Sequence, residues 1–193
     1  MKKLLGILVL GLFLITPSQA DDIRDFQIEG MSLGDSLLDY FSEEEIKKNK
    51  KDYYTNDKFT AVDFFEVPFL KTFEGAQIHY KTKSKKYIIY SLDFVRIFEN
   101  SINECYRKQN EIEADFSAMF TSAKKYKKIK QKHPEDRSGK STVTSVYFNL
   151  DLGGYASVEC YDWSEKMGYP DQIRVSITSK ELSDWLNTPN IYK

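Results

Sequence analysis

Hydrophobic and polar residues alternate with a period of two in two blocks of the chain. The first block, residues 58–98, holds three such runs, and the second, residues 141–178, holds three more. Alternation with this period indicates β-strands that bury one face. Polar or glycine-rich connections, such as Gly153-Gly154, separate successive runs, so each block is predicted to form an antiparallel meander of three strands.

Between the two blocks, residues 101–123 carry apolar side chains at helical spacing. The stripe consists of Cys105, Ile112, Phe116, Met119 and Ala123. These intervals place the side chains on one side of a helix, and Ser101 with Glu104 has the sequence of a capping box that would begin it. A helix that is apolar on one side must cover another element, so we expect it to pack on one face of the sheet.

Two further helices are predicted at the ends of the pattern. The first begins at a cap formed by Ser32 and restarts at the capping box of Ser42 and Glu45, and the last begins at Thr178, which is followed by Glu181. The resulting order is helix, three strands, helix, three strands, helix. It predicts an α+β fold with an antiparallel sheet of about six strands, and it indicates duplication of an αβββ unit.

The first 20 residues have the pattern of a secretory signal peptide. Two lysines precede an apolar run over residues 4–15, which is too short to span a bilayer, and small side chains lead up to Ala20. We therefore expect cleavage after Ala20, a single mature α+β domain over residues 21–193, and a periplasmic or secreted location. No later segment is apolar enough to serve as a transmembrane anchor.

The charge of the mature chain is close to neutral. Removing Lys2 and Lys3 from the 28 basic residues leaves 26 against 29 acidic ones, a formal charge of −3. This balance gives no general attraction to nucleic acid, which is therefore not expected as a partner. The two histidines and two cysteines match no metal-ligand spacing, and neither a metal site nor a cofactor is predicted.

The chain has two cysteines, Cys105 on the helix stripe and Cys160 in a strand. An exported protein matures where thiols oxidise, and both positions are expected to face the core. We predict that the pair forms a disulfide. Two reduced core cysteines are the alternative, because the sequence does not show whether the two Cα atoms are close enough for a bridge.

The run Gly34-Asp35-Ser36-Leu37 resembles the opening block of the GDSL esterases and lipases, in which the serine is the nucleophile. That resemblance implies a small serine hydrolase that uses Ser36. The family also has a Gly-x-Asn-Asp block and an Asp-x-x-His near the C-terminus, and this chain has neither. Because a serine without a base is a poor nucleophile, a place in the first turn of a helix explains the run better, and no catalytic residue is assigned.

Residues 124–140 are rich in lysine and are broken by Pro134 and Gly139. This composition predicts a mobile surface loop. An anionic envelope component could be bound there by Lys132, His133, Arg137, Lys140 and Ser141. A solvated loop whose charges aid solubility is the alternative.

A second candidate site is aromatic. Tyr155, Tyr161 and Trp163 share one phase of a predicted strand, opposite to Ala156 and Cys160. If the small apolar phase meets the helix, the aromatic phase lies on the other face of the sheet and offers a recognition face. Cross-strand aromatic packing without any partner explains the same pattern.

Several segments resemble a group of small exported proteins from free-living marine bacteria that have no assigned function. They are IEGMSLGDSLLDYFSEEEI, KYIIYS, CYRKQNEIE, KHPEDRSGKST, ECYDWSE and ITSKELSDWL. The resemblance implies export and no particular activity. A looser similarity, over Gly-Met-Ser and the helix before a meander, is to the small lipoproteins of the outer-membrane assembly machinery and the β-lactamase-inhibitor fold, as fold analogy only.

These observations favour an exported binding or interaction module over an enzyme, because no catalytic constellation can be assembled. Its partner would be an envelope protein or an anionic ligand. The alternatives are a small hydrolase that uses Ser36 and a binder of an anionic envelope component through residues 124–140.

Overall fold

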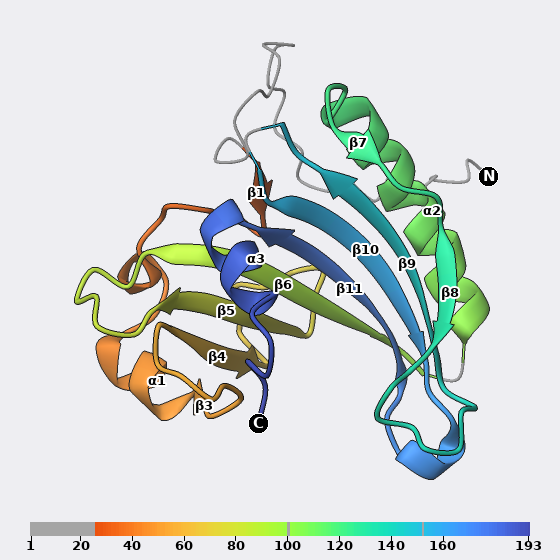
Figure 1. Ribbon diagram of the computed structural model, residues 1–193, viewed down its shortest axis with the longest axis horizontal. Helices are drawn as coiled ribbons and strands as arrows, with labels where there is room; N and C mark the ends of the chain where they lie inside the picture. Colours follow the sequence, from red (N-terminus) through yellow and green to blue (C-terminus); the bar gives the residue numbers. More distant parts are fainter. Residues whose placement is uncertain (1–25, 100, 152) are drawn as a thin grey trace, which may run out of the picture.

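The computed structural model describes residues 26–99, 101–151 and 153–193. The predicted signal peptide, residues 1–20, lies outside the described residues. The described part is mostly antiparallel sheet with three α-helices (Figure 1), which confirms the α+β class. The helices are α1 (Glu43–Lys48), α2 (Ile102–Met119) and α3 (Lys180–Leu186).

The six longest strands form the two predicted meanders. The first contains β4 (Phe59–Phe65), β5 (Gly75–Lys81) and β6 (Ile89–Phe98), and the second contains β9 (Thr142–Asn149), β10 (Tyr155–Asp162) and β11 (Asp171–Thr178). β6 pairs with β11 in antiparallel orientation, so both meanders belong to one continuous sheet. The order β4-β5-β6-β11-β10-β9 is symmetric about this central pair. Two copies of one unit would produce that symmetry, and the duplication stays a prediction.

The expected number of about six strands is wrong, because the described residues form eleven. The five additional strands are β1 (Gln27–Ile28), β2 (Met31–Ser32), β3 (Lys50–Lys51), β7 (Lys124–Lys125) and β8 (Ile129–Lys132). β1 and β2 form a separate hairpin, whereas β3, β7 and β8 pair along the edges of the main sheet. Strands of two to four residues are too short to show a period, so only pairing with a neighbour reveals them.

Alternation along the strands gives the main sheet two chemically different faces. One of them, the apolar face, carries Val62, Phe64, Ala76, Ile78, Leu92, Phe94, Val146, Phe148, Ala156, Val158, Cys160, Ile173, Val175 and Ile177. The opposite, polar face carries Asp63, Gln77, His79, Ser91, Asp93, Ser145, Tyr147, Tyr155, Ser157, Glu159, Arg174, Ser176 and Thr178. The apolar face belongs to the main hydrophobic core, together with residues 26–41 and α2.

The helix α2 packs on the apolar face, as predicted. It lies beside β9 and β10 in Figure 1 and buries Cys105, Ile112 and Phe116. The disulfide between Cys105 and Cys160 joins it to β10, with 6.0 Å between the two Cα atoms. Gln109 is also buried on this stripe, and its Nε2 donates to two strand carbonyls at 2.6 and 2.9 Å.

Several predicted helix boundaries are wrong. Helix α2 ends at Met119 instead of residue 123, because Lys124 already pairs with β9, and the side chain of its N-terminal residue Ser101 makes no capping hydrogen bond. Ser32 lies in β2, where its backbone N–H donates to Asp35. The closing helix α3 is capped by the residue after Thr178. The capping box of Ser42 with Glu45 is confirmed at the start of α1.

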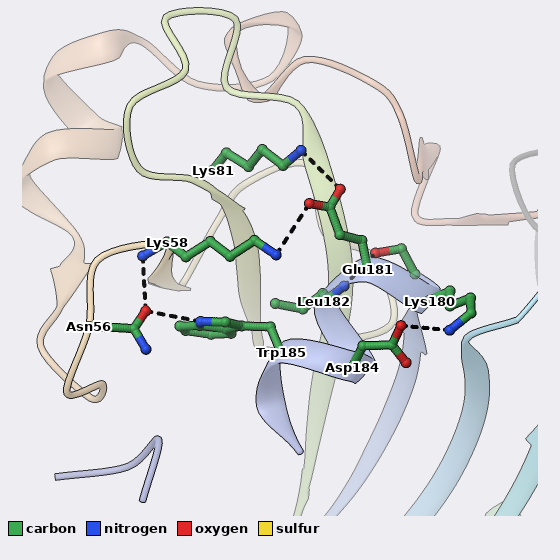
Figure 2. A network of polar contacts seen from close by, with 9 residues as sticks. Asn56, Lys58, Lys81, Lys180, Glu181, Leu182, Asp184 and Trp185 are labelled. Atoms are coloured by element: carbon green, nitrogen blue, oxygen red, sulfur yellow. Dashed lines mark hydrogen bonds and ion pairs between the residues drawn. The ribbon is translucent and has the colours of Figure 1, made fainter. Parts of the chain in front are cut away.

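The helix α3 lies on the polar face and covers one end of it. Leu182 and Trp185 pack against Phe59 of β4 and against Tyr54 in a second, smaller hydrophobic cluster. Figure 2 shows the polar contacts around this helix. Glu181 lies between Lys58, which precedes β4, and Lys81 of β5, and the Trp185 indole N–H donates to Asn56. The two main helices therefore cover opposite faces of one sheet.

Candidate ligand-binding site

A cavity of about 200 Å³ opens on the polar face. Four neighbouring strands, β5, β6, β11 and β10, supply its floor, because the register aligns polar side chains in rows across them. One such row runs from Gln77 through Asp93 and Ser176 to Ser157. The walls come from Tyr53 and Tyr54, from the end of α3 and from the C-terminal residues. Segments far apart in the sequence thus meet at one site.

The floor of the cavity is polar, and half of its residues are as inaccessible as the core. His79 is 3% exposed, and Ser91 and Thr178 are each 1% exposed. Polar side chains are rarely buried to this degree unless they are hydrogen-bonded or serve a site. Burial of so many hydroxyl groups together distinguishes this surface from an ordinary solvated sheet face.

A chain of hydrogen bonds centres on His79. Ser91 Oγ donates its proton to Asp93 Oδ2 at 3.1 Å. Because that proton is engaged, Ser91 Oγ acts as the acceptor for the N–H of His79 Nδ1, which lies 2.6 Å away. The remaining ring nitrogen, Nε2, then accepts from the Tyr54 hydroxyl at 2.5 Å. Burial lowers the pKa of His79 against the opposing effect of the Asp93 carboxylate, so the imidazole is neutral at neutral pH.

The positive charge of the cavity is the guanidinium group of Arg174. Its Nε is fully buried and has no hydrogen-bond partner, and no described carboxylate lies within ion-pair distance of the group. The ring of Tyr161 lies 5.5 Å from the guanidinium carbon. Burial by itself lowers the pKa of Arg174, but Tyr161 and nearby carboxylates more than offset it and raise the pKa. The group is therefore permanently charged and incompletely paired.

Two carboxylates line the same cavity in different states. Glu159 is fully engaged, because Oε1 accepts from Ser145 and Tyr147, each at 2.7 Å, and Oε2 accepts from Tyr161 at 3.3 Å. Asp93 accepts one hydrogen bond from the described residues, the bond from Ser91. Asp93 thus keeps free acceptor capacity that faces the cavity.

The predicted recognition residues lie on or beside the polar face. Tyr155 lines the cavity itself, and burial together with Asp93 raises its pKa to about 12, so its hydroxyl keeps its proton. Tyr161 contacts Arg174, and Trp163 stacks on Tyr161 with 5.8 Å between ring centroids. Of the three side chains, Tyr155 lines the cavity, whereas Tyr161 and Trp163 lie farther along the chain, at and just after the end of β10.

The five predicted anion-binding residues do not form one cradle. Ser141 is buried and donates to Asp136 at 2.6 Å, so a carboxylate of the chain itself occupies that position. Hydrogen bonds from serines 138 and 141 hold the pKa of Asp136 well below its usual range. His133 instead packs on Trp163, with 4.4 Å between ring centroids, while Lys132, Arg137 and Lys140 are exposed.

The segment 124–140 is also more ordered than the predicted mobile loop. Its first part contains β7 and β8, both paired with β9, and its last part is a turn around Asp136. Lysine side chains at a sheet edge keep the exposed backbone from pairing with other chains. Four of the eight basic residues that suggested a loop, Lys124, Lys125, Lys130 and Lys132, therefore belong to edge strands.

The geometry around Ser36 matches a cap. Its hydroxyl donates to the Lys86 carbonyl at 2.8 Å and accepts from the Leu38 N–H at 3.2 Å, at the start of a short 3₁₀ helix (Leu37–Asp39). Within the described ranges no histidine is hydrogen-bonded to it. The hydrolase alternative stays a prediction without a base placed beside its serine.

The described residues contain neither a metal-binding cluster nor a membrane-spanning helix. No group of histidine, cysteine and acidic side chains there is arranged to hold a metal ion. In the same residues no helix has the length and apolar character needed to cross a membrane.

Comparison with known proteins gives no match: no family model, no curated protein and no solved structure corresponds to this chain. The resemblances named from the sequence therefore stay predictions.

Arg174, His79 and Asp93 were missed as site residues when the sequence was considered alone. Each lies on the polar phase of a strand, and a polar phase normally faces solvent. The signal that could have found them is that three consecutive strands of the core, β5, β6 and β11, all place charged or titratable groups on this phase.

Proposed function

We propose that this protein is an exported, non-enzymatic binding module that holds a small polar ligand in the cavity of the polar face. The observation that carries the proposal is Arg174, a charged side chain that lines the polar cavity, has a buried Nε without a hydrogen-bond partner, and has no ion-pair partner among the described residues. A buried charge is costly unless it is paired, so its retention favours a site that a ligand completes.

The size and chemistry of the cavity support a small ligand. Its volume of about 200 Å³ is below the roughly 300–1,000 Å³ of pockets that hold drug-sized molecules. Ser157, Ser176 and Tyr155 line the same cavity as the charge and offer hydroxyl groups for hydrogen bonds. The site is built on strands, which hold side chains more rigidly than loops do.

The hydrogen bonding of His79, the only histidine that lines the cavity among the described residues, favours binding over catalysis. Both ring nitrogens of His79 are engaged, by Tyr54 and by Ser91. A general base must be within reach of a substrate proton, and this imidazole would first have to give up an internal bond. The proposal therefore assigns His79 a role in shaping the site.

A thermal-shift screen of amino acids, sugars and small organic acids tests the proposal. A ligand at 100 times its Kd should raise the Tm by roughly 5–10 °C for a domain of this size. The rise should disappear in Arg174→Gln and persist in Arg137→Gln, which removes an exposed arginine outside the cavity. A ligand whose effect is equal in both variants would place binding elsewhere and contradict the proposal.

A further inference from the structure

Three charged side chains line the cavity, those of Asp93, Glu159 and Arg174, and among the described residues Arg174 forms an ion pair with neither carboxylate. In the backbone register of β6 and β11, Asp93 lies opposite Ser176 and Val95 lies opposite Arg174. Asp93 and Arg174 are therefore diagonal neighbours on adjacent strands. Diagonal neighbours are about 7–8 Å apart at their backbones. The aspartate and the arginine form no ion pair with each other within the described residues, although both face the cavity.

The other carboxylates and the histidine around the cavity already have two or more hydrogen-bond partners each. Glu159 accepts three hydrogen bonds from its neighbours. Asp63, beside the cavity, accepts from Tyr53 and Gln77 at 2.6 and 2.9 Å. His79 is held between Tyr54 and Ser91. Arg174 and Asp93 are therefore the charged groups of the cavity with the fewest hydrogen-bond partners among the described residues, and the most capacity left for a ligand.

The arrangement of charges disfavours simple ions as ligands. A phosphate attracted to Arg174 would lie close to the carboxylates of Asp93 and Glu159, and a simple cation attracted to Asp93 would be repelled by Arg174. A molecule that carries one charge of each sign satisfies both groups at once. An α-amino acid has its ammonium and carboxylate groups on one carbon, which suits two charges set this close together.

We propose, on the basis of the binding function proposed above, that the ligand is a small zwitterion of the amino-acid class. Its carboxylate binds the guanidinium of Arg174, and its ammonium group binds the free carboxylate oxygen of Asp93. The hydroxyl groups of Ser157, Ser176 and Tyr155 contact the rest of the ligand, which favours a short and polar side chain.

Titration calorimetry on the purified mature protein tests the charge requirement with three matched probes. L-Serine carries both charges, glycerate replaces its ammonium by a hydroxyl group, and L-serinamide replaces its carboxylate by a neutral amide. Serine should bind at least tenfold more tightly than either analogue, because each analogue leaves one buried charge without a partner. Equal affinity for serine and one analogue would overturn the role of the charge that this analogue lacks.

Two variants separate the roles of the charged residues. Arg174→Gln should weaken serine binding at least tenfold. Asp93→Asn should reverse the preference, so that glycerate binds more tightly than serine, because the arginine keeps its attraction for carboxylate while the acceptor for ammonium is lost. Arg137→Gln and Asp184→Asn change exposed charges outside the cavity and should bind serine as the wild type does. Circular dichroism and a free-thiol count establish that each variant is folded.

Inorganic phosphate and D-glucose complete the panel and distinguish two kinds of failure. Binding of phosphate or glucose without serine, lost in Arg174→Gln, would overturn the zwitterion and leave the cavity as a binding site. If none of the five compounds binds to the wild type, both the zwitterion and the proposed function of the cavity are overturned.

Discussion

Both faces of the main sheet contain fully buried side chains, but the chemistry of those side chains differs. On the apolar face, Ile78, Leu92 and Ile177 are 0% exposed, and on the polar face Ser91 and Thr178 are 1% exposed. Burial of the first set is favourable in itself, at about 25 cal/mol per Å² of apolar surface. Burial of the second set is tolerated only where hydrogen bonds replace those to water. Burial of side chains therefore indicates stability on the apolar face and a site on the polar face.

The covers of the two faces differ as well. Helix α2 spans 18 residues and is joined covalently to β10. The polar face is covered by α3, which spans 7 residues, and by the C-terminal residues, whose Tyr192 pairs with Tyr54 in an isolated bridge. The ion pairs that hold α3 are exposed, and exposed pairs stabilise weakly. The apolar side should therefore dominate the stability of the fold.

The largest expected effect comes from removing the disulfide that ties α2 to the apolar face. The two cysteines are 55 residues apart in the sequence. In the chain-entropy model, closing a loop of this length adds about 4 kcal/mol to the free energy of unfolding. Urea unfolding of the Cys105→Ala, Cys160→Ala double variant should show a loss of roughly 2–5 kcal/mol against the oxidised wild type. Equal midpoints for the two proteins would show that the cross-link is not what holds this helix.

Adjacent residues on β11 provide the sharpest direct comparison of the faces. Ile177 is in the apolar core, and Ser176 lines the cavity. Ile177→Ala should destabilise the protein by about 2–5 kcal/mol, because it leaves a void in a packed core. Ser176→Ala, a change on the neighbouring residue, should cost less than about 1 kcal/mol. Chemical unfolding of both variants checks this, and a reversed order would contradict the assignment of the faces.

The polar face should also make stability depend on pH. Burial lowers the pKa of His79, so the unfolded chain binds a proton more readily than the folded one. Stability should therefore fall as pH drops below the unfolded value of about 6.5, by at most about 1.4 kcal/mol per pH unit from this group. Asp93, Asp63, Arg174 and Tyr54 are the titratable groups that act on it or touch it.

Unfolding curves of the wild type and of His79→Gln between pH 7.5 and pH 5.5 measure this contribution. The variant should lose the histidine part of the slope, whatever its absolute stability. His133→Gln is the matched control, because it removes the partly exposed histidine outside the cavity. A wild-type curve that is flat over this interval would rule out the buried neutral imidazole.

The smallest effect is expected at the anchor of α3. Glu181 contacts Lys81 at 2.9 Å and Lys58 at 3.5 Å (Figure 2), and all three side chains are substantially exposed. Glu181→Gln should cost less than about 1 kcal/mol, and the difference from the wild type should shrink further in 1 M salt. A loss of several kcal/mol would mean that the cover of the polar face is held as firmly as that of the apolar face.

Much of the fold could be predicted because its signals are long and local. The meanders and the apolar stripe of α2 each extend over many residues, and Cys105 and Cys160 both fell on the apolar phase of their elements. Helix starts were predicted less accurately than the strands. Serine or threonine precedes an acidic residue at several positions, and the tertiary contacts determine which of these residues caps a helix. Ser36 and Ser179 are the caps, whereas Ser32 and Thr178 lie in strands.

The sequence by itself determined the class of the fold, the two meanders and the apolar face, because each depends on a repeating pattern that neighbouring residues already contain. The tertiary structure alone decided that the polar face is enclosed. That enclosure requires α3 and the C-terminal residues to fold back onto strands more than a hundred residues earlier, where Trp185 meets Asn56 and Tyr192 meets Tyr54. Only then does Arg174, an ordinary outward-facing residue by its pattern, become a half-buried charge with a buried Nε in the lining of a cavity.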